Sequence, residues 1–168
     1  MAPYFQIKWH SSAAPYTVGE SFELALKESY THIYELLGAL DEDHFVFTSS
    51  GAEAVNHVVM SAYIDVTRKT GKNHFLATAL NEAPSILSMT RLQELGALFD
   101  MVPVDAKGQV TKEAVAESLT PRTALLSLSL ACGVTGVWQK LEGISELCKE
   151  RGVLLHVDVT HALGKGEV

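Results

Sequence analysis

The feature that most constrains the fold is a repeated alternation between short apolar runs and segments in which apolar residues recur at helical spacing. The apolar runs predict strands at residues 44–50, 73–80, 97–105, 123–131 and 153–159. The segments with helical spacing predict helices at 18–38, 51–69, 84–96, 111–119 and 141–152. The apolar runs are continuous, as in parallel strands that helices cover on both faces. We therefore expect a three-layer α/β/α fold with a mostly parallel sheet.

Charge and composition argue against several classes of partner. The 168 residues carry a formal net charge of −7, and we interpret the cationic stretch Arg68–Lys72 as a solvated helix end. Nucleic-acid binding needs a basic face, so no nucleic-acid partner is expected. No apolar stretch approaches the roughly 20 residues of a membrane span, and the N-terminus lacks the pattern of a secretory signal. Cys132 and Cys148 make no disulfide framework and suit a reducing cytoplasm.

Ligands of parallel α/β sheets bind outside the C-terminal ends of the strands. The candidate functional segments, at or just after predicted strand ends, are therefore 48–53, 80–84, 130–136 and 158–161. In the first of them, Ser49, Ser50 and Gly51 lead into a helix whose first N–H groups and positive dipole end suit a phosphate. An ordinary strand–helix turn with a serine N-cap is the alternative.

Asp158 allows three interpretations. It follows His156 by two residues on a predicted strand, so both side chains share a face, and His161 follows in the turn. Together these three residues suit a metal ion, as in a metal-dependent hydrolase. Asp158 can instead cap a turn. Thirdly, its carboxylate can pair with the ring nitrogen of pyridoxal 5'-phosphate and keep that nitrogen protonated, which makes the ring an electron sink.

Five segments occur in an order and at a spacing that resemble one family. They are IKWHSSAAPYT (7–17), FTSSGAEAVN (47–56), LNEAPSIL (80–87), LSLACGVTGVWQKLEGISELCKERG (128–152) and LLHVDVTHALGK (154–165). The chain resembles the class V aminotransferases, and within them the cysteine desulfurases and selenocysteine lyases. The resemblance implies a fold-type-I, pyridoxal-phosphate-binding large domain that is incomplete at its C-terminus. Residues 1–17 would be an N-terminal segment, and residues 18–168 the N-terminal portion of that domain.

The resemblance also implies which residues contact the cofactor. The Gly51 and Ala52 backbone amides would hold its phosphate, and Asp158 would pair with the pyridinium nitrogen. His161 stands where the family has a Gln beside the phenolic oxygen, and an imidazole can still donate there. Ala83 stands where the family has a His stacked on the pyridine ring.

Other positions depart from the family's pattern. Ala52 replaces a phosphate-binding Thr, and Cys132 or Gly133 stands in place of an Asn near the phenolic oxygen. The lysine that forms a Schiff base with the cofactor would lie beyond this chain, because neither Lys140 nor Lys165 is at the matching place. The resemblance thus implies no catalytic residue and no metal ligand within residues 1–168.

The resemblance implies that the whole enzyme removes sulfur from L-cysteine or a related amino acid, giving alanine and an enzyme-bound persulfide. It implies a cytoplasmic homodimer in iron–sulfur cluster assembly, with a possible sulfur-acceptor protein. The last predicted strand lacks a covering helix, so a missing C-terminal half or a second chain is expected to pack there. Two alternatives stay open: a divergent or inactive class V relative, and a metal-dependent hydrolase that uses His156, Asp158 and His161.

Overall fold

Residues 47–168 fold around a four-stranded sheet in the computed structural model of this chain. The structure describes residues 2–8, 11 and 17–166. It divides into two compact units, Met1–Val46 and Phe47–Val168. Among the described residues, no helix has both the length and the apolar character needed to cross a bilayer.

The first unit contains two helices, α1 (Ala2–Gln6) and α2 (Thr17–Leu37). The predicted helix at 18–38 is confirmed, and it ends at Gly38, whose φ of +60° suits a residue without a side chain. An edge-to-face contact with a 5.7 Å centroid distance joins Tyr4 of α1 to Phe22 of α2. Of the predicted N-terminal segment, residues 1–17, residues 1, 9–10 and 12–16 lie outside the described residues.

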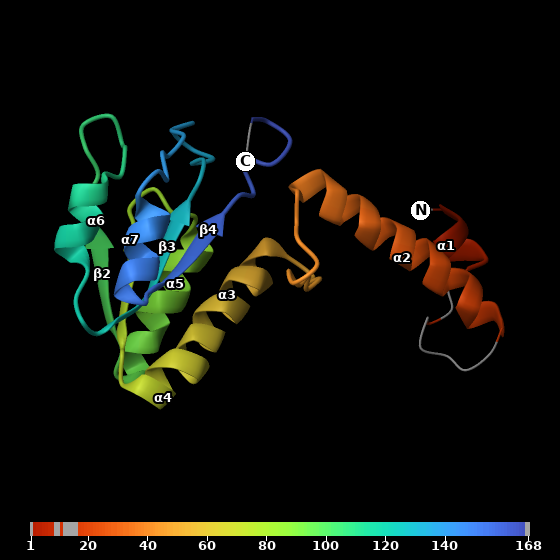
Figure 1. The fold of residues 1–168 in the computed structure, drawn as a ribbon, viewed down its shortest axis with the longest axis horizontal. Coiled ribbons are helices and arrows are strands. Elements are labelled where there is room, and N and C mark those ends of the chain that lie inside the picture. The colour runs from red at the N-terminus through yellow and green to blue at the C-terminus, as the bar shows by residue number, and fades with distance from the viewer. Residues whose placement is uncertain (1, 9–10, 12–16, 167–168) are drawn as a thin grey trace. The chain divides into compact units, whose positions relative to one another are not determined.

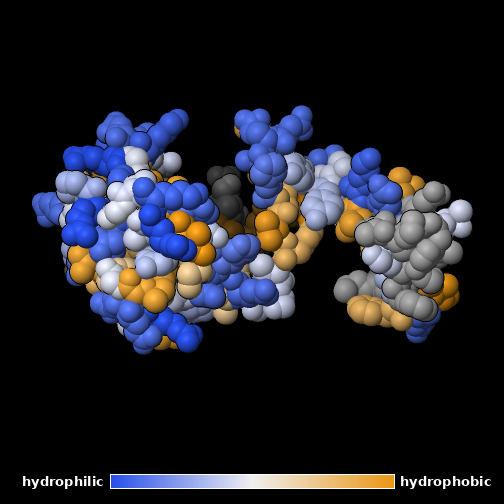
Figure 2. Space-filling view, turned by 90° about the horizontal axis from the view of Figure 1, so that it is seen from below, coloured by the Kyte–Doolittle hydropathy of each residue, from blue (hydrophilic) through white to orange (hydrophobic). Residues whose placement is uncertain are grey.

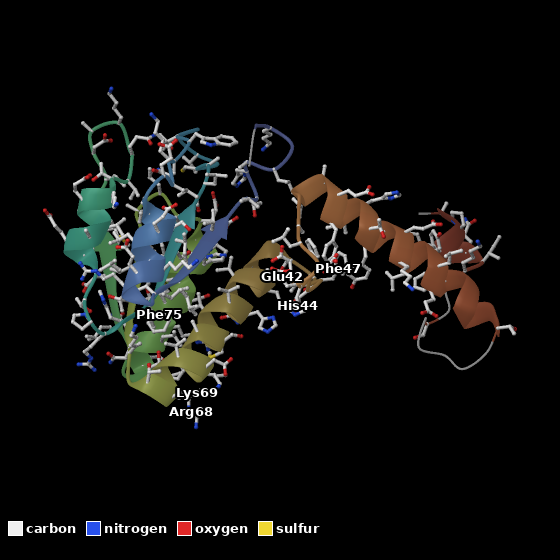
Figure 3. The ribbon with its side chains drawn as sticks, in the orientation of Figure 1. Glu42, His44, Phe47, Arg68, Lys69 and Phe75 are labelled. Carbon is white, nitrogen blue, oxygen red and sulfur yellow. The ribbon has the colours of Figure 1, made fainter. Side chains whose placement is uncertain are left out.

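The predicted strand at 44–50 is wrong. These residues have no strand structure, and Val46 and Phe47 are 68% and 64% exposed. Figure 3 labels Phe47 in the stretch that leads to the next helix. A strand forms only when a neighbour accepts its backbone hydrogen bonds, and none of the four strands of the described sheet pairs with this segment.

The predicted helix at 51–69 is confirmed as one helical run. It consists of α3 (Gly51–Ala62), a π-helical turn η1 (Tyr63–Thr67) and α4 (Arg68–Thr70). Arg68 and Lys69 lie at the end of the run farthest from Gly51 (Figure 3), where both are exposed. Lys69 pairs with Asp65 at 2.7 Å. Cations at a helix C-terminus complement its dipole, which agrees with a solvated helix end.

The sheet is entirely parallel, with strand order β2–β1–β3–β4. Its strands are β1 (His74–Thr78), β2 (Leu98–Val102), β3 (Thr123–Ser129) and β4 (Leu154–Asp158). The arrowheads of β2, β3 and β4 point the same way in Figure 1. The central strands β1 and β3 are buried throughout, whereas β2 and β4 are edge strands and partly exposed. Burial on both faces therefore holds for the central strands only.

Three further helices connect the strands, as predicted. They are α5 (Ala83–Leu92), which continues as the 3₁₀ turn η2 (Gln93–Leu95), α6 (Lys112–Ser118) and α7 (Ile144–Arg151). The Thr111 hydroxyl accepts from the Ala114 amide at 3.1 Å and so caps the helix that was predicted to begin at residue 111. Gly96 and Gly152 end their helical segments with positive φ.

Two apolar clusters on opposite faces of the sheet make three layers. One cluster joins the sheet to α6 and α7 through Leu76, Leu126, Val115, Leu147 and Cys148. The other joins it to α3 and α5 through residues that include Val59, Phe75, Met89 and Leu125. The predicted α/β/α architecture is confirmed. The face of this unit seen in Figure 2 is mostly hydrophilic, with smaller hydrophobic patches.

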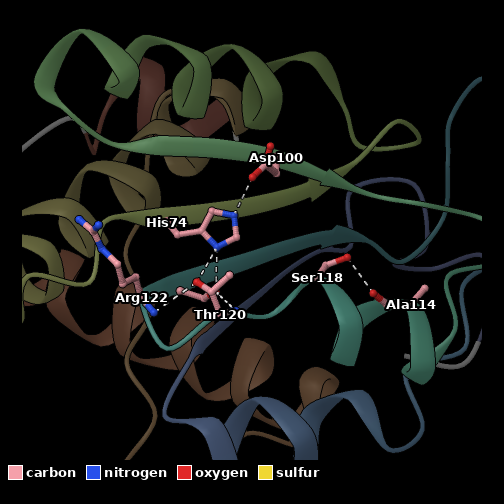
Figure 4. Close-up of polar contacts among 7 residues, drawn as sticks. His74, Asp100, Ala114, Ser118, Thr120 and Arg122 are labelled. Carbon is pink, nitrogen blue, oxygen red and sulfur yellow. Dashed lines mark hydrogen bonds and ion pairs between the residues drawn. The ribbon is translucent and has the colours of Figure 1, made fainter.

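A buried histidine ties three strands together near their N-terminal ends. The His74 side chain is 4% exposed, and its Nε2 lies 3.2 Å from the Asp100 carboxylate of β2. Its Nδ1 lies 2.9 Å from the Thr123 hydroxyl and 3.3 Å from that of Thr120. Figure 4 shows these contacts. They stabilise the end of the sheet that is remote from the strand ends expected to bind ligands.

Gln139 holds two loops together with its buried side-chain amide. Its Oε1 accepts from the Val110 amide and its Nε2 donates to the Gly108 carbonyl, both at 2.8 Å. We expect Gln139→Ala to lower the free energy of unfolding by about 2–3 kcal/mol, because both backbone groups lose their partner. Urea unfolding measures this loss. Gln109→Ala, which removes one bond to the Trp138 carbonyl, should cost less; an equal loss would contradict the argument.

Candidate functional site

The C-terminal ends of β1, β3 and β4 meet at the Glu82 side chain. The Glu82 amide donates to the Ser129 hydroxyl at 3.2 Å, which fixes the start of α5 beside the end of β3. The Glu82 Oε1 accepts from the Gly133 amide at 3.3 Å and lies 3.3 Å from His161 Nε2. One carboxylate oxygen thus joins three of the loops in which ligands of such sheets bind.

His161 lies directly against the backbone of Gly133. A Cβ atom at position 133 would lie 2.5 Å from His161 Nε2 and 2.8 Å from two ring carbons. Any larger residue would therefore displace the imidazole. The structure brings His161 and Gly133 together, and Glu82, within the candidate segment 80–84, is a further partner whose role the sequence did not indicate. Its position directly after a predicted strand was the available signal.

Asp158 ends β4, where it is paired in register with Ser129 of β3. Its Oδ1 accepts from the Thr160 amide at 3.0 Å, so one oxygen does cap the turn after the strand. The structure gives its second oxygen no hydrogen-bond partner among the described residues. The side chain is half-buried. Asp158 therefore caps the turn, as one of the three interpretations holds, and its other carboxylate oxygen is left for a ligand.

The first turn of α3 lies beside the loop after β4. A Cβ at Gly51 would lie 3.9 Å from the Thr160 hydroxyl. Ser50 is the N-cap, and its hydroxyl accepts from the Glu53 amide at 3.2 Å. Gly51 and Ala52 occupy the first two helical positions, where an amide has no partner within the helix, and both are exposed. The serine cap and two amides suited to an anion thus coexist.

The Glu53 carboxylate belongs to the same turn. It accepts hydrogen bonds from the Ser49 hydroxyl and from the Ser49 amide, the second at 2.7 Å. These two hydrogen bonds lower the pKa of Glu53 below its ordinary value. The ionised carboxylate therefore closes the turn from the side of Ser49.

A buried network of hydrogen-bonded polar side chains lies beneath the site. Asn81 accepts from the Thr78 amide at 2.9 Å and donates to the Ser127 hydroxyl at 3.1 Å. Ser127 also lies 2.8 Å from His156 Nδ1 and 3.4 Å from the Ser85 hydroxyl. This network links β1, β3, β4 and α5. Sequence analysis missed it, although the serines within the apolar run of residues 123–131 were a visible signal.

His156 belongs to this hydrogen-bonded network of side chains. Burial lowers its pKa below the ordinary value of a histidine, while the charge of Asp158 opposes the shift. The unfolded state then binds the proton more readily than the folded state. We expect the contribution of His156 to stability to be fully present above the ordinary histidine pKa of about 6.5 and to be lost as the pH falls through the lowered value.

Urea unfolding of the wild type and of His156→Asn across this pH range tests the prediction. The asparagine keeps a polar partner for Ser127 and does not titrate. The stability difference between wild type and variant should shrink as the medium becomes more acidic. A difference that grows with acidity would contradict the sign of the shift.

The metal-ligand interpretation is not supported. Among the described residues, no group of three or more His, Cys, Asp and Glu side chains is arranged to hold a metal ion. His156 points to Ser127, Asp158 accepts from Thr160, and His161 contacts Glu82. The three residues are close in sequence, but each is engaged by a different partner.

The two cysteines are free and buried. Cys148 lies in the apolar core. Cys132 lies in the loop after β3, and hydrogen bonds with the side chain and backbone of Thr135 lower its pKa below the ordinary value of a thiol. Ala83 is exposed at the start of α5, next to Glu82.

Comparison with known proteins identifies the family. The family model for class V aminotransferases matches residues 4–168. This chain belongs to the class V aminotransferase family. It is 31% identical over 164 residues to a cysteine desulfurase of Nostoc sp., and 30% identical over 167 residues to the cysteine desulfurase NifS of Azotobacter vinelandii. These matches cover 97% and 98% of this chain and 40% of each relative.

Two solved structures show the same fold. A NifS-like protein superposes with a TM-score of 0.89 at 23% identity, over 98% of this chain and 45% of that one. The cysteine desulfurase CsdA of Escherichia coli superposes with a TM-score of 0.75 at 17% identity, over 95% of this chain and 40% of that one. The fold is therefore that of a fold-type-I large domain, and this chain spans less than half the length of these two proteins.

The described residues fit pyridoxal phosphate at two of its ends. The first turn of α3 offers two backbone amides to a phosphate, and Asp158 keeps one oxygen for a ring nitrogen. Between these ends, Ala52 offers no hydroxyl and Ala83 no aromatic ring. The site thus offers backbone amides and a carboxylate to such a ligand, and no hydroxyl or aromatic ring at positions 52 and 83.

Proposed function

We propose that this chain is the N-terminal part of the large domain of a pyridoxal-phosphate-dependent cysteine desulfurase. The whole enzyme would remove sulfur from L-cysteine or a related amino acid, giving alanine and an enzyme-bound persulfide. The observation that carries this proposal is similarity to cysteine desulfurases along 97–98% of the chain. The meeting of the Glu82, Asp158 and His161 segments at one sheet edge supports it.

Each residue has a proposed task. When bound, the cofactor supplies an electron sink for negative charge at the substrate Cα. The amides of Gly51 and Ala52 would donate to its phosphate, and the Asp158 carboxylate would hold a positive charge at its ring nitrogen. The Thr160 amide, which donates to the other Asp158 oxygen, keeps that carboxylate oriented. His161 would contact the phenolic oxygen.

The rest of the enzyme is proposed to complete the site. β4 is an edge strand of the described sheet, and Leu154 on it is 48% exposed. A C-terminal half or a second chain packed there would cover this edge and supply the lysine and the cysteine that the family uses. A cytoplasmic homodimer that passes sulfur to an acceptor protein for iron–sulfur cluster assembly is proposed from the family relationship.

The test uses the full-length protein, with the intact mass of every polypeptide in the sample measured first. We expect it to bind pyridoxal phosphate and to release L-alanine and sulfide in equal amounts from L-cysteine in the presence of a thiol. Cofactor binding without alanine would assign the chain to another class V activity.

A second candidate is an inactive relative that keeps the fold and lacks the chemistry. Ala52 and Ala83 favour it, because each removes a side-chain contact to the cofactor. Titration of the full-length protein with pyridoxal phosphate separates the two candidates. An inactive relative would show no saturable absorbance change, whereas the desulfurase would.

A further inference from the structure

Glu82 lies at the centre of the site, yet the proposed function gives it no task. We propose that Glu82 is a positioning residue that fixes the ring orientation and the tautomer of His161, so that Nδ1 is the nitrogen presented to a ligand at this sheet edge. The identity of that ligand, the phenolic oxygen of pyridoxal phosphate, rests on the proposed function. The positioning itself rests on contacts within this chain.

The first observation is the sharing of one carboxylate oxygen. Glu82 Oε1 accepts from the Gly133 amide and lies 3.3 Å from His161 Nε2. The Gly133 amide holds the carboxylate at the end of β3, and the Glu82 amide is anchored on Ser129 of the same strand. Backbone groups thus fix the position of the Glu82 oxygen, and the His161 ring is oriented toward that oxygen.

The second observation is the close approach of the His161 ring to Gly133. Three ring atoms, Nε2 and its two neighbouring carbons, lie within 2.8 Å of the place that a Cβ would take. The Nε2 side of the imidazole therefore faces both Gly133 and Glu82. Nδ1 is the remaining nitrogen, and the structure gives it no hydrogen-bond partner among the described residues.

The third observation concerns exposure. The side chains of His161 and Glu82 are 37% and 30% exposed. Solvent screens such a pair, so its contribution to the stability of the fold is small. The His161–Glu82 contact therefore adds little to the stability of the fold but fixes the direction of the imidazole ring. Such a contact is suited to orienting a functional group.

The chemical consequence follows from the two ring nitrogens. A carboxylate accepts a hydrogen bond and cannot donate one, so the nitrogen beside Glu82 carries hydrogen. In the neutral imidazole, Nδ1 then accepts a hydrogen bond from a hydroxyl. In the imidazolium, Nδ1 donates to an anionic oxygen. The family's Gln can do both through separate atoms, whereas His161 held in this way does one at a time.

The test is the side-chain ¹⁵N spectrum of His161 in the full-length protein, recorded without cofactor at alkaline pH, where imidazoles are neutral. The His161 signals are assigned from their loss in His161→Asn. We expect the wild type to carry hydrogen on Nε2 and none on Nδ1. Glu82→Ala should give a mixture of both tautomers, and Glu82→Gln, which retains an acceptor oxygen, should restore the wild-type spectrum.

Two further variants separate positioning from general damage to the fold. Gly133→Ala should displace the ring and give mixed tautomers although Glu82 is intact. Glu117→Ala, at an exposed position on α6, should leave the His161 spectrum unchanged. The proposal is overturned if the wild type carries hydrogen on Nδ1, or if Glu82→Ala leaves the spectrum as it was.

Titration with pyridoxal phosphate then tests the ligand separately. Addition to the wild type should shift the His161 Nδ1 signal, and Glu82→Ala should weaken binding several-fold. If the wild type binds no cofactor, the proposed function fails, while the tautomer measurement still decides whether Glu82 positions His161.

Discussion

Replacement of Asp158 by asparagine in the full-length protein is expected to lower the rate of alanine formation from L-cysteine by about 10²–10³-fold. The carboxylate charge at the ring nitrogen would be lost, and loss of one preorganised electrostatic contact in an active site costs about this much. Asparagine keeps the size of the side chain and an oxygen for the Thr160 amide. The turn after β4 should therefore survive the change.

Steady-state rates with L-cysteine, together with the absorbance spectrum of the bound cofactor, measure this effect. The thermal unfolding midpoint serves as the control and should change little. Asp158→Glu, which retains the charge, should recover part of the activity. If Asp158→Asn were as active as the wild type, Asp158 would be only the turn cap that the geometry also shows.

Leu126→Ala is expected to lower the free energy of unfolding by about 3–5 kcal/mol. Leu126 is fully buried in the central strand β3, between Leu76 of β1 and Leu155 of β4 in register, and it contributes to the core under α6 and α7. Close-packed neighbours cannot collapse fully into the space that the larger side chain leaves. The loss is a large part of the total stability of a typical domain.

Leu154→Ala provides a matched control on the neighbouring strand. Leu154 is 48% exposed on β4, so its removal takes less apolar surface from the core. Where nothing covers this edge, urea unfolding should show a much smaller loss for Leu154→Ala than for Leu126→Ala. In the full-length protein, a large loss at Leu154 would indicate that further protein covers the β4 edge, as the proposed function requires.

The candidate site differs from the family's pattern at several positions. Ala52 and Ala83 remove a hydroxyl and a ring from the family's cofactor contacts, and His161 replaces an amide. Under the proposed function, Asp158 and the first turn of α3 would keep the contacts made by charge and by backbone amides. A protein with this combination can bind the cofactor through its two ends while holding the ring less tightly.

The sequence by itself determined the elements whose formation depends on neighbouring residues. The helical run from Gly51 and the capping of α6 by Thr111 followed from local pattern. So did the helix ends at Gly38 and Gly152, because backbone conformation and capping act within a few residues. The five family segments likewise located Gly51, Asp158 and His161 at strand or helix ends before any contact was known.

Only the tertiary structure decided which distant residues meet. Residues 44–50 have the composition of a strand but no paired neighbour, and β-structure depends on its partners more than on its own residues. His156, Asp158 and His161 are adjacent in sequence yet turn to three different partners. Glu82 meets His161 because parallel strands bring their C-terminal ends to one edge, a contact across 79 residues that no local pattern encodes.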